Sequence, residues 1–375
     1  MKDKYLKQIR NGLYIILAIV ILAICKITSS VSINMILSVF IFLIMMPMVN
    51  TLEHAHVKKA IATLIAILAM IVVVFAVVWF VLYTVNQLLG IIPAYSMRII
   101  YLDNFLMDLI RRWRPVSEGE SILKFLNIDW LSTIVPILRS VSTSTISILK
   151  NAVVTMLLAI FLLLERHTLV PKLNAATSNR DNPEKAAMML ERINKQVSKY
   201  LGMKLILSLI TGLLFYALGL IVKLDLAFLW GVLAVFLNFI PTFGSIIITI
   251  ITILMAIIQF LPDWTPILIV AGGTIAVQMI VGNILDPRLQ GNQLNLSPFV
   301  ILVSLSVFGY IWGIVGMFLA VPIISILQII FANMDSTRGI AVMLSSGSSL
   351  KRRMKSENKD RTESKYDDVL FPQQK

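Results

Sequence analysis

Two interrupted apolar stretches decide the fold of this chain. The first runs from residue 225 to 261 and is broken by NFIPTFG at residues 238–244, and the second runs from 298 to 333 and is broken by GYIWGIVG at 309–316. As one straight helix, either stretch would reach roughly 54 Å, against about 30 Å for the hydrocarbon core of a bilayer. Neither stretch is therefore a simple span, and paired breaks in two long hydrophobic segments are typical of the binding region of a transporter.

Composition assigns the chain to the integral membrane proteins. Hydrophobic residues make up 58% and charged residues 14% of it, with a mean hydropathy of +0.87. A transmembrane β-barrel would alternate polar and apolar residues in short segments, whereas the apolar runs here are unbroken, so the spans are helices. We predict an all-α polytopic membrane protein with eight hydrophobic segments, two of them broken or re-entrant, at about 11–25, 31–49, 61–89, 146–164, 201–222, 225–261, 264–282 and 298–333.

These segments predict five regions along the chain. Two regions contain amphipathic helices outside the spans, one from 99 to 113 on the outer side and one from 183 to 201 expected on the inner membrane surface. Between 115 and 147, enrichment in Ser, Thr, Pro and Gly predicts looser structure. The regions are 1–89 (three helices), 90–150 (a long extracytoplasmic segment), 151–200 (fourth span and amphipathic helix), 201–335 (transport core) and 336–375 (a basic, disordered cytoplasmic tail).

Basic residues predict that both termini are cytoplasmic. Treating the two broken segments alike leaves an even number of crossings, and most of the 33 basic residues then fall in segments on the same side as the termini. The basic residues predicted on the outer side are Lys26, Lys223, Arg288 and seven residues of the 90–150 segment. The net charge of +13 accordingly indicates topology and attraction to anionic inner-leaflet lipid, and not binding of nucleic acid.

Several classes of function lack their motifs. The single cysteine, Cys25, excludes an intrachain disulfide, and the three histidines lack the spacing of a metal site. No phosphate-binding glycine loop and no serine elbow is present. We therefore expect no enzyme, no cofactor, no metal and no catalytic residue.

Ion coupling has little support in the spans. No Asp or Glu lies in the interior of the eight runs, and Lys150 and Lys204 lie near run ends, where a long amine can reach the membrane surface. The nearest carboxylates are Glu165, Asp225, Asp263 and Asp286. A single-carboxylate site requires one of them to turn inward, and Asp286 is the best placed.

The polar segment 283–298 separates two apolar runs. It contains Asp286 and Arg288 together with five side-chain amides, which suit recognition of hydroxyl and carbonyl groups in a neutral solute. The alternative interpretation is a hydrated loop between two prolines.

Five short motifs follow one another in a familiar order. They are LNFIPTFG at 237–244, DPRLQG at 286–291, LSP at 296–298, WGIVG at 312–316 and LAVP at 319–322. Together they resemble the AI-2E family of bacterial membrane permeases, and the resemblance begins at about residue 196. One departure is Phe243-Gly244-Ser245, where the family has an aromatic residue, Gly and Pro.

This resemblance implies an eight-segment permease of the bacterial cell membrane that forms a homo-oligomer, such as a pentamer. Members are assigned to export of the quorum-sensing signal autoinducer-2 (AI-2), and a minority to sodium or lithium/proton antiport. Exporter, antiporter and non-transporting membrane scaffold all remain open at this point.

Two groups of residues are predicted to carry transport. Pro241 lacks an amide hydrogen and leaves carbonyls unpaired, which is tolerated at membrane depth only where protein or a wet cavity covers them. The expected substrate pathway of a small polar solute comprises Asn238, Pro241, Thr242, Gly244, Asp286, Arg288, Gln290, Gly291 and Asn292. The expected hinge or packing positions are Gly309, Gly313, Gly316 and Pro322.

Overall fold

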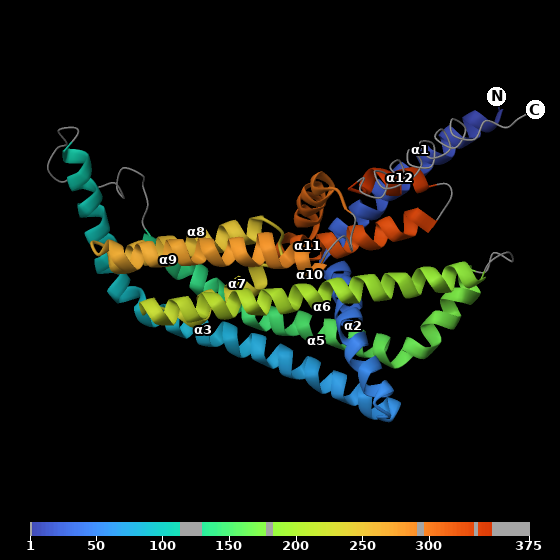
Figure 1. Cartoon of the computed structure of the whole chain (residues 1–375), viewed down its shortest axis with the longest axis horizontal. Helices are drawn as coiled ribbons and strands as arrows, with labels where there is room; N and C mark the ends of the chain where they lie inside the picture. The colour runs from blue at the N-terminus through green and yellow to red at the C-terminus, as the bar shows by residue number, and fades with distance from the viewer. Residues whose placement is uncertain (1, 113–129, 178–182, 291–295, 334–336, 347–375) are drawn as a thin grey trace, which may run out of the picture. The chain divides into compact units, whose positions relative to one another are not determined.

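The described residues are almost entirely helical. A computed structural model of the chain describes residues 2–112, 130–177, 183–290, 296–333 and 337–346 (Figure 1). Within these ranges the only strand-like feature is an isolated bridge between Leu296 and Ser345. The elements are α1 (Lys2–Ile27), α2 (Ser29–His54), α3 (Lys59–Arg111), α5 (Trp130–Thr177), α6 (Pro183–Val222), α7 (Ala227–Leu237), α8 (Phe243–Phe260), α9 (Trp264–Gln278), the π-helix η1 (Met279–Leu285), α10 (Asp286–Gln290), α11 (Pro298–Asn333) and α12 (Arg338–Leu344).

The expectation of an all-α polytopic membrane protein is confirmed. In the described part of the chain, seven helices are long and apolar enough to cross a membrane, and two shorter apolar helices cover Ile16–Ile27 and Ala227–Leu237. Large apolar side chains stay exposed on these helices, as lipid-facing surfaces require. The helices form two compact units, one from residues 1–33, 166–201 and 292–375 and the other from 34–165 and 202–291.

Three helices are longer than the sequence predicts. α3 continues without a break to Arg111, and α5 begins at Trp130, so the expectation of looser structure up to residue 147 is wrong from 130 onward. Residues 115–129 lie outside the described ranges. α6 begins at Pro183, as the proline at a first helical turn predicts, but runs on to Val222. The amphipathic helix and the fifth span are therefore one element.

Small residues bring α2, α3 and α5 together. Val49, Ala62, Ala66 and Ala159 are fully buried in one apolar cluster with Leu163. In a bilayer there is little hydrophobic force between helices, so close packing of small side chains supplies the attraction.

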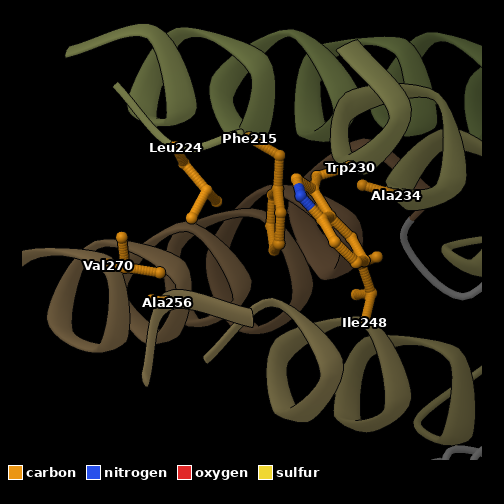
Figure 2. Close-up of a cluster of buried hydrophobic side chains, with 7 residues drawn as sticks. All are labelled: Phe215, Leu224, Trp230, Ala234, Ile248, Ala256 and Val270. Atoms are coloured by element: carbon orange, nitrogen blue, oxygen red, sulfur yellow. The ribbon is translucent and has the colours of Figure 1, made fainter. Parts of the chain in front are cut away.

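A second apolar cluster joins α6, α7, α8 and α9. Figure 2 shows the rings of Phe215 and Trp230 beside each other, with Ile248 and Val270 in the same buried cluster. Close approach of α6 and α7 depends on Gly212 and Gly231, because a Cβ on either would overlap backbone or side-chain atoms of the facing helix. α8 and α9 then lie side by side over this cluster (Figure 1).

The first broken stretch folds into a helical hairpin. α7 has 11 residues, so it rises about 16 Å and is too short to cross a hydrocarbon core of about 30 Å. The chain reverses at residues 238–242, and α8 returns along α7. A Cβ on Gly244 would overlap the carbonyl oxygen of Leu237, so only glycine permits this tight reversal.

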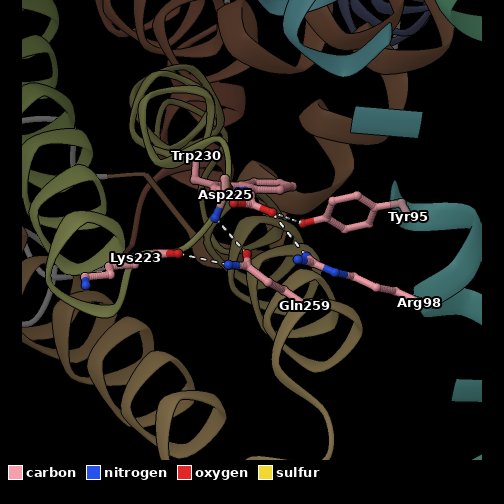
Figure 3. A network of polar contacts seen from close by, with 6 residues as sticks. All are labelled: Tyr95, Arg98, Lys223, Asp225, Trp230 and Gln259. Carbon is pink, nitrogen blue, oxygen red and sulfur yellow. Dashed lines mark hydrogen bonds and ion pairs between the residues drawn. The ribbon is translucent and has the colours of Figure 1, made fainter. Parts of the chain in front are cut away.

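The other end of this hairpin is tied to α3 by a polar network around Asp225 (Figure 3). Its carboxylate accepts hydrogen bonds from Tyr95 Oη at 2.8 Å and from Arg98 Nη1 at 3.2 Å. The side chain of Gln259 bridges the α6–α7 loop: its Oε1 accepts from the Asp225 amide at 2.7 Å, and its Nε2 donates to the Lys223 carbonyl at 2.9 Å. One side chain of α8 thus satisfies two backbone groups of the loop.

α9 and η1 run back along α6. Gly273 packs on Leu218 near the end of α6, and Asp286 lies beside Lys204 near the start of the apolar part of α6. From residue 204 to 223 a helix rises about 28 Å. Arg288 and Lys223 therefore lie near opposite ends of the apolar part of α6, and the expectation that both lie on the outer side is wrong.

The second broken stretch also folds back on itself. In α11, Gly313 has φ 65° and ψ −145°, a conformation that glycine adopts readily and other residues avoid. A Cβ on Gly316 would overlap the carbonyl oxygen of Phe308, whereas a straight helix separates these positions by about 12 Å. Residues 298–312 and 314–333 are therefore the two arms of a hairpin with its tip at Gly313.

Candidate functional site

A cavity with a mixed polar and apolar lining lies at the turn between α7 and α8. Its volume is about 450 Å³, within the range of pockets that hold small molecules. Four structural elements build it: α6, the α7–α8 hairpin, α9 with η1, and the start of α10. The lining residues are Lys204, Asn238, Pro241, Thr242, Ser245, Ile246, Thr249, Ile250, Ile275, Gln278, Met279, Gly282, Asn283 and Asp286.

The hairpin turn supplies one wall of the cavity. Asn238 is 5% exposed, and its Nδ2 donates a hydrogen bond to Ser208 Oγ at 3.1 Å, which fixes the turn to α6. Thr242 has φ 63° and ψ −56°, and the Phe243 amide donates to the Pro241 carbonyl at 2.7 Å. These angles and this hydrogen bond define a γ-turn of the rare, strained type. A β-branched residue in this conformation is held there by its surroundings.

An ion pair forms another part of the lining. Lys204 Nζ donates to Asp286 Oδ2 at 3.2 Å, and the Lys204 side chain is 6% exposed while that of Asp286 is 27% exposed. These are the charged residues among those that line the cavity, and their charges cancel. The cavity therefore offers polar groups on a largely apolar lining and has no dominant charge.

The π-helix η1 contributes a further part of the lining. The Asp286 amide bonds to the Val281 carbonyl, five residues back, in place of the α-helical partner four residues back. Pro287 follows and has no amide hydrogen to donate to Asn283, so this part of the helix can widen. The widened turn presents Met279, Gly282 and Asn283 to the cavity.

Gln278 contributes an unusual polar group at the start of η1. Both Nε2 and Oε1 of its carboxamide are buried, and neither has a hydrogen-bond partner among the described residues. A buried carboxamide without partners is costly unless water or a solute satisfies it. Gln278 therefore adds unused donor and acceptor capacity beside the cavity.

The structure brings together part of the predicted substrate pathway. Asn238, Pro241, Thr242 and Asp286 line the cavity, while Gly244 is buried within the hairpin turn. Arg288 is exposed on α10 and is not among the lining residues. Gln290 ends α10 and its side chain is not described; Gly291 and Asn292 lie outside the described ranges.

The predicted hinge or packing positions lie together in α11. Gly313 forms the hairpin tip, Gly316 packs on the Phe308 backbone, and Gly309 faces the Met317 side chain. Pro322 is fully buried in the second arm. Close packing therefore accounts for two of the three glycines, and backbone conformation accounts for the third.

Two cavity residues were missed or misread in the sequence. Lys204 was expected to reach the membrane surface, yet the residue is 4% exposed and pairs with Asp286, so that interpretation is wrong. Its position inside an apolar run was the available signal, because a buried lysine needs an anionic partner. Gln278 could have been noticed in the same way, because it is a lone amide in an apolar run.

Among the described residues, no group of three or more His, Cys, Asp or Glu side chains is placed to hold a metal ion.

Comparison with known proteins identifies the family to which this chain belongs. The family model described as "AI-2E family transporter" matches residues 14–336. A putative transport protein of Haemophilus influenzae is 30% identical over 337 residues, covering 89% of this chain and 96% of its own. The AI-2 transport protein TqsA of Escherichia coli is 29% identical with the same coverage, and a putative transport protein of Borreliella burgdorferi is 32% identical over 70% of each chain. A match over nearly the whole chain shows that this protein belongs to the AI-2E transporter family.

Proposed function

We propose that this protein is a permease that exports a small neutral polar solute, with autoinducer-2 as the leading candidate, through the cavity at the α7–α8 turn. The observation that carries the proposal is the lining of this cavity. It combines an internally neutralised ion pair, the side chain of Asn238 and an apolar wall with the amide of Gln278, which has no hydrogen-bond partner in the described part of the chain.

The chemistry of the lining suits a polyhydroxylated solute that carries a carbonyl group. Such a molecule needs several donors and acceptors and no fixed counter-charge. Thr242, Ser245 and Thr249 offer hydroxyl groups that both donate and accept, and Lys204 offers additional N–H donors. The carbon skeleton of the proposed solute would contact the apolar side chains of the lining, namely Ile246, Ile250 and Ile275.

The relatives support AI-2 as the candidate cargo. TqsA of E. coli carries AI-2 transport in its name, and its alignment covers 89% of this chain. The other relatives named above are described only as putative transport proteins. The choice of AI-2 as the cargo is therefore based on the name of one relative and on the chemistry of the cavity.

Cation/proton antiport is the competing function. It requires Asp286 to bind an alkali cation or a proton in turn. Lys204 already places an ammonium group 3.2 Å from this carboxylate, so an incoming cation would have to displace it. The arrangement favours the neutral solute.

The cellular setting is part of the proposal. We place the protein in the bacterial cell membrane with both termini in the cytoplasm, because the basic residues gather on that side. Its basic segments then face anionic lipid of the inner leaflet. We also propose a homo-oligomer.

The test uses the purified full-length protein in sealed vesicles. Efflux of AI-2 is measured beside the response of an internal pH dye to added sodium or lithium. Asn238→Ala and Asp286→Asn change the cavity, and Arg288→Gln is the matched control because Arg288 is a charged residue of α10 outside the lining.

Two results are decisive. AI-2 efflux that is lost in both cavity variants and retained in Arg288→Gln, with a silent dye, supports the proposed function. A cation-dependent dye response that disappears in Asp286→Asn contradicts it in favour of antiport. Silence in both assays moves the assignment to another cargo or to a scaffold.

A further inference from the structure

The break at Gly313 puts the last turn of the first α11 arm at the tip of the hairpin. The first arm ends at Trp312, just before the break at Gly313. The last four carbonyl groups of any helix have no intrahelical donor, and they carry the negative end of the helix dipole. Gly309, Tyr310, Ile311 and Trp312 occupy these positions.

The end of α1 reaches this tip with a charged side chain. Lys26, in the last turn of α1, donates a hydrogen bond from Nζ to the Tyr310 carbonyl oxygen at 2.6 Å. The same Nζ lies 4.3 Å from the centroid of the Tyr310 ring. One ammonium group therefore contacts both the backbone carbonyl and the aromatic face of a single residue, and both contacts favour a cation.

Further contacts fix this arrangement. Trp312 Nε1 donates to Ser32 Oγ at 2.9 Å, and Ser32 Oγ donates to the Cys25 carbonyl at 2.9 Å. The junction between α1 and α2 thus holds the hairpin tip on both sides of Ile311. These contacts join residues that lie close in the chain to Lys26 and Tyr310, whose own side chains are exposed.

Carbonyl groups at the C-terminal ends of broken helices bind sodium in ion-coupled carriers. Here a covalently attached cation already stands at such an end. We propose that Lys26 is a built-in cation that fills this carbonyl site, so that the α11 hairpin is held together without a free alkali ion. For transport, which rests on the proposed function, solute flux is then independent of sodium and lithium.

Removing the ammonium group exposes the site to ions from solution. Lys26→Gln leaves the Tyr310 carbonyl and its neighbours without a cation, so sodium, lithium or potassium becomes stabilising. Lys26→Arg keeps the charge and should behave as the unchanged protein. Lys150→Gln is the matched control, because Lys150 is an exposed lysine in α5, far along the chain from the α11 break.

The first measurement is the thermal unfolding midpoint of the purified full-length protein in detergent. The midpoint is followed during titration with sodium, lithium or potassium chloride, with choline chloride holding the ionic strength constant. We expect flat titrations for the unchanged protein, Lys26→Arg and Lys150→Gln. Lys26→Gln should have a lower midpoint in choline, and the alkali ions should raise it with saturation.

The second measurement is AI-2 efflux from vesicles in choline and in sodium. In choline, the AI-2 flux of Lys26→Gln should be about tenfold lower than that of the unchanged protein, which is the effect expected for the loss of one charge-assisted hydrogen bond. Sodium should restore part of this flux. If the unchanged protein moves no AI-2, the proposed function fails, while the unfolding titration still tests Lys26.

Three outcomes would overturn the inference. One is a saturable response of the unchanged protein to an alkali ion, which would mean that the site is open. Another is a midpoint for Lys26→Gln that equals that of the unchanged protein in choline and does not respond to any ion. If Lys26→Gln cannot be purified folded, Tyr310→Leu replaces it: this variant keeps the carbonyl and loses the ring, so a saturable ion response from it also contradicts a filled site.

Discussion

Lys204 and Asp286 lie 82 positions apart in the sequence, and their side chains meet at 3.2 Å between Nζ and Oδ2. The pair joins α6 to the start of α10, directly after the π-helix. Lys204 is almost fully buried, while Asp286 retains some contact with solvent at the cavity. Removing one member of such a pair leaves an uncompensated charge in a region of low dielectric constant, whereas removing both does not.

A double-mutant cycle should reveal this dependence. We expect Lys204→Met and Asp286→Asn each to lower the free energy of unfolding, by up to about 3 kcal/mol for the buried pair, and the double variant to lose less than the sum. Chemical unfolding in detergent measures all four proteins. Strictly additive losses would show that the two side chains do not stabilise one another.

Any side chain at position 244 should destabilise the α7–α8 turn. Gly244→Ala forces its Cβ against the Leu237 carbonyl, which belongs to the backbone and cannot rotate away. We expect a loss of about 1–3 kcal/mol in the free energy of unfolding. Gly272→Ala is the control, because nothing lies within 4 Å of the Cβ it adds in α9. Equal stability of the two variants would contradict the tight turn.

Replacing Thr242 with glycine should stabilise the folded protein. Thr242→Gly relieves the strain of a positive φ of 63° at a β-branched residue, and we expect a higher unfolding midpoint, corresponding to about 1 kcal/mol or more. Thr249→Gly, on the same cavity wall but inside α8, should lower the midpoint by a similar energy because glycine weakens a helix interior. A lower midpoint for Thr242→Gly would mean that its side chain contributes more than its backbone costs.

Gln259 should stabilise the α6–α7 loop through both ends of its amide. Gln259→Leu removes the hydrogen bonds to the Asp225 amide and the Lys223 carbonyl, and we expect a loss of about 1 kcal/mol for each. Gln259→Glu keeps the acceptor and loses the donor, so its loss should be intermediate. Hydrogen exchange of the Asp225 amide provides a local readout, and unchanged protection in Gln259→Leu would contradict the assignment.

The helical breaks and the cavity differ in how far the sequence predicts them. Pro241, Gly244 and Gly313 act on the backbone of their own segment, so local chemistry was enough to place both breaks. The cavity depends on which helix faces which. Arg288 was expected beside Asp286 in the lining, yet the short helix α10 leaves it exposed. Gln278, the last residue of α9, lines the cavity although the sequence did not single it out.

By itself the sequence determined an all-helical membrane protein with eight hydrophobic segments and two breaks, because hydrophobic length, glycine and proline act locally and independently of packing. Only the tertiary structure decided that Lys204 is buried against Asp286 and that Lys26 contacts Tyr310. Each of these contacts depends on how two distant helices pack, and in an apolar run every face of a helix is hydrophobic, so periodicity carries no information about its neighbour.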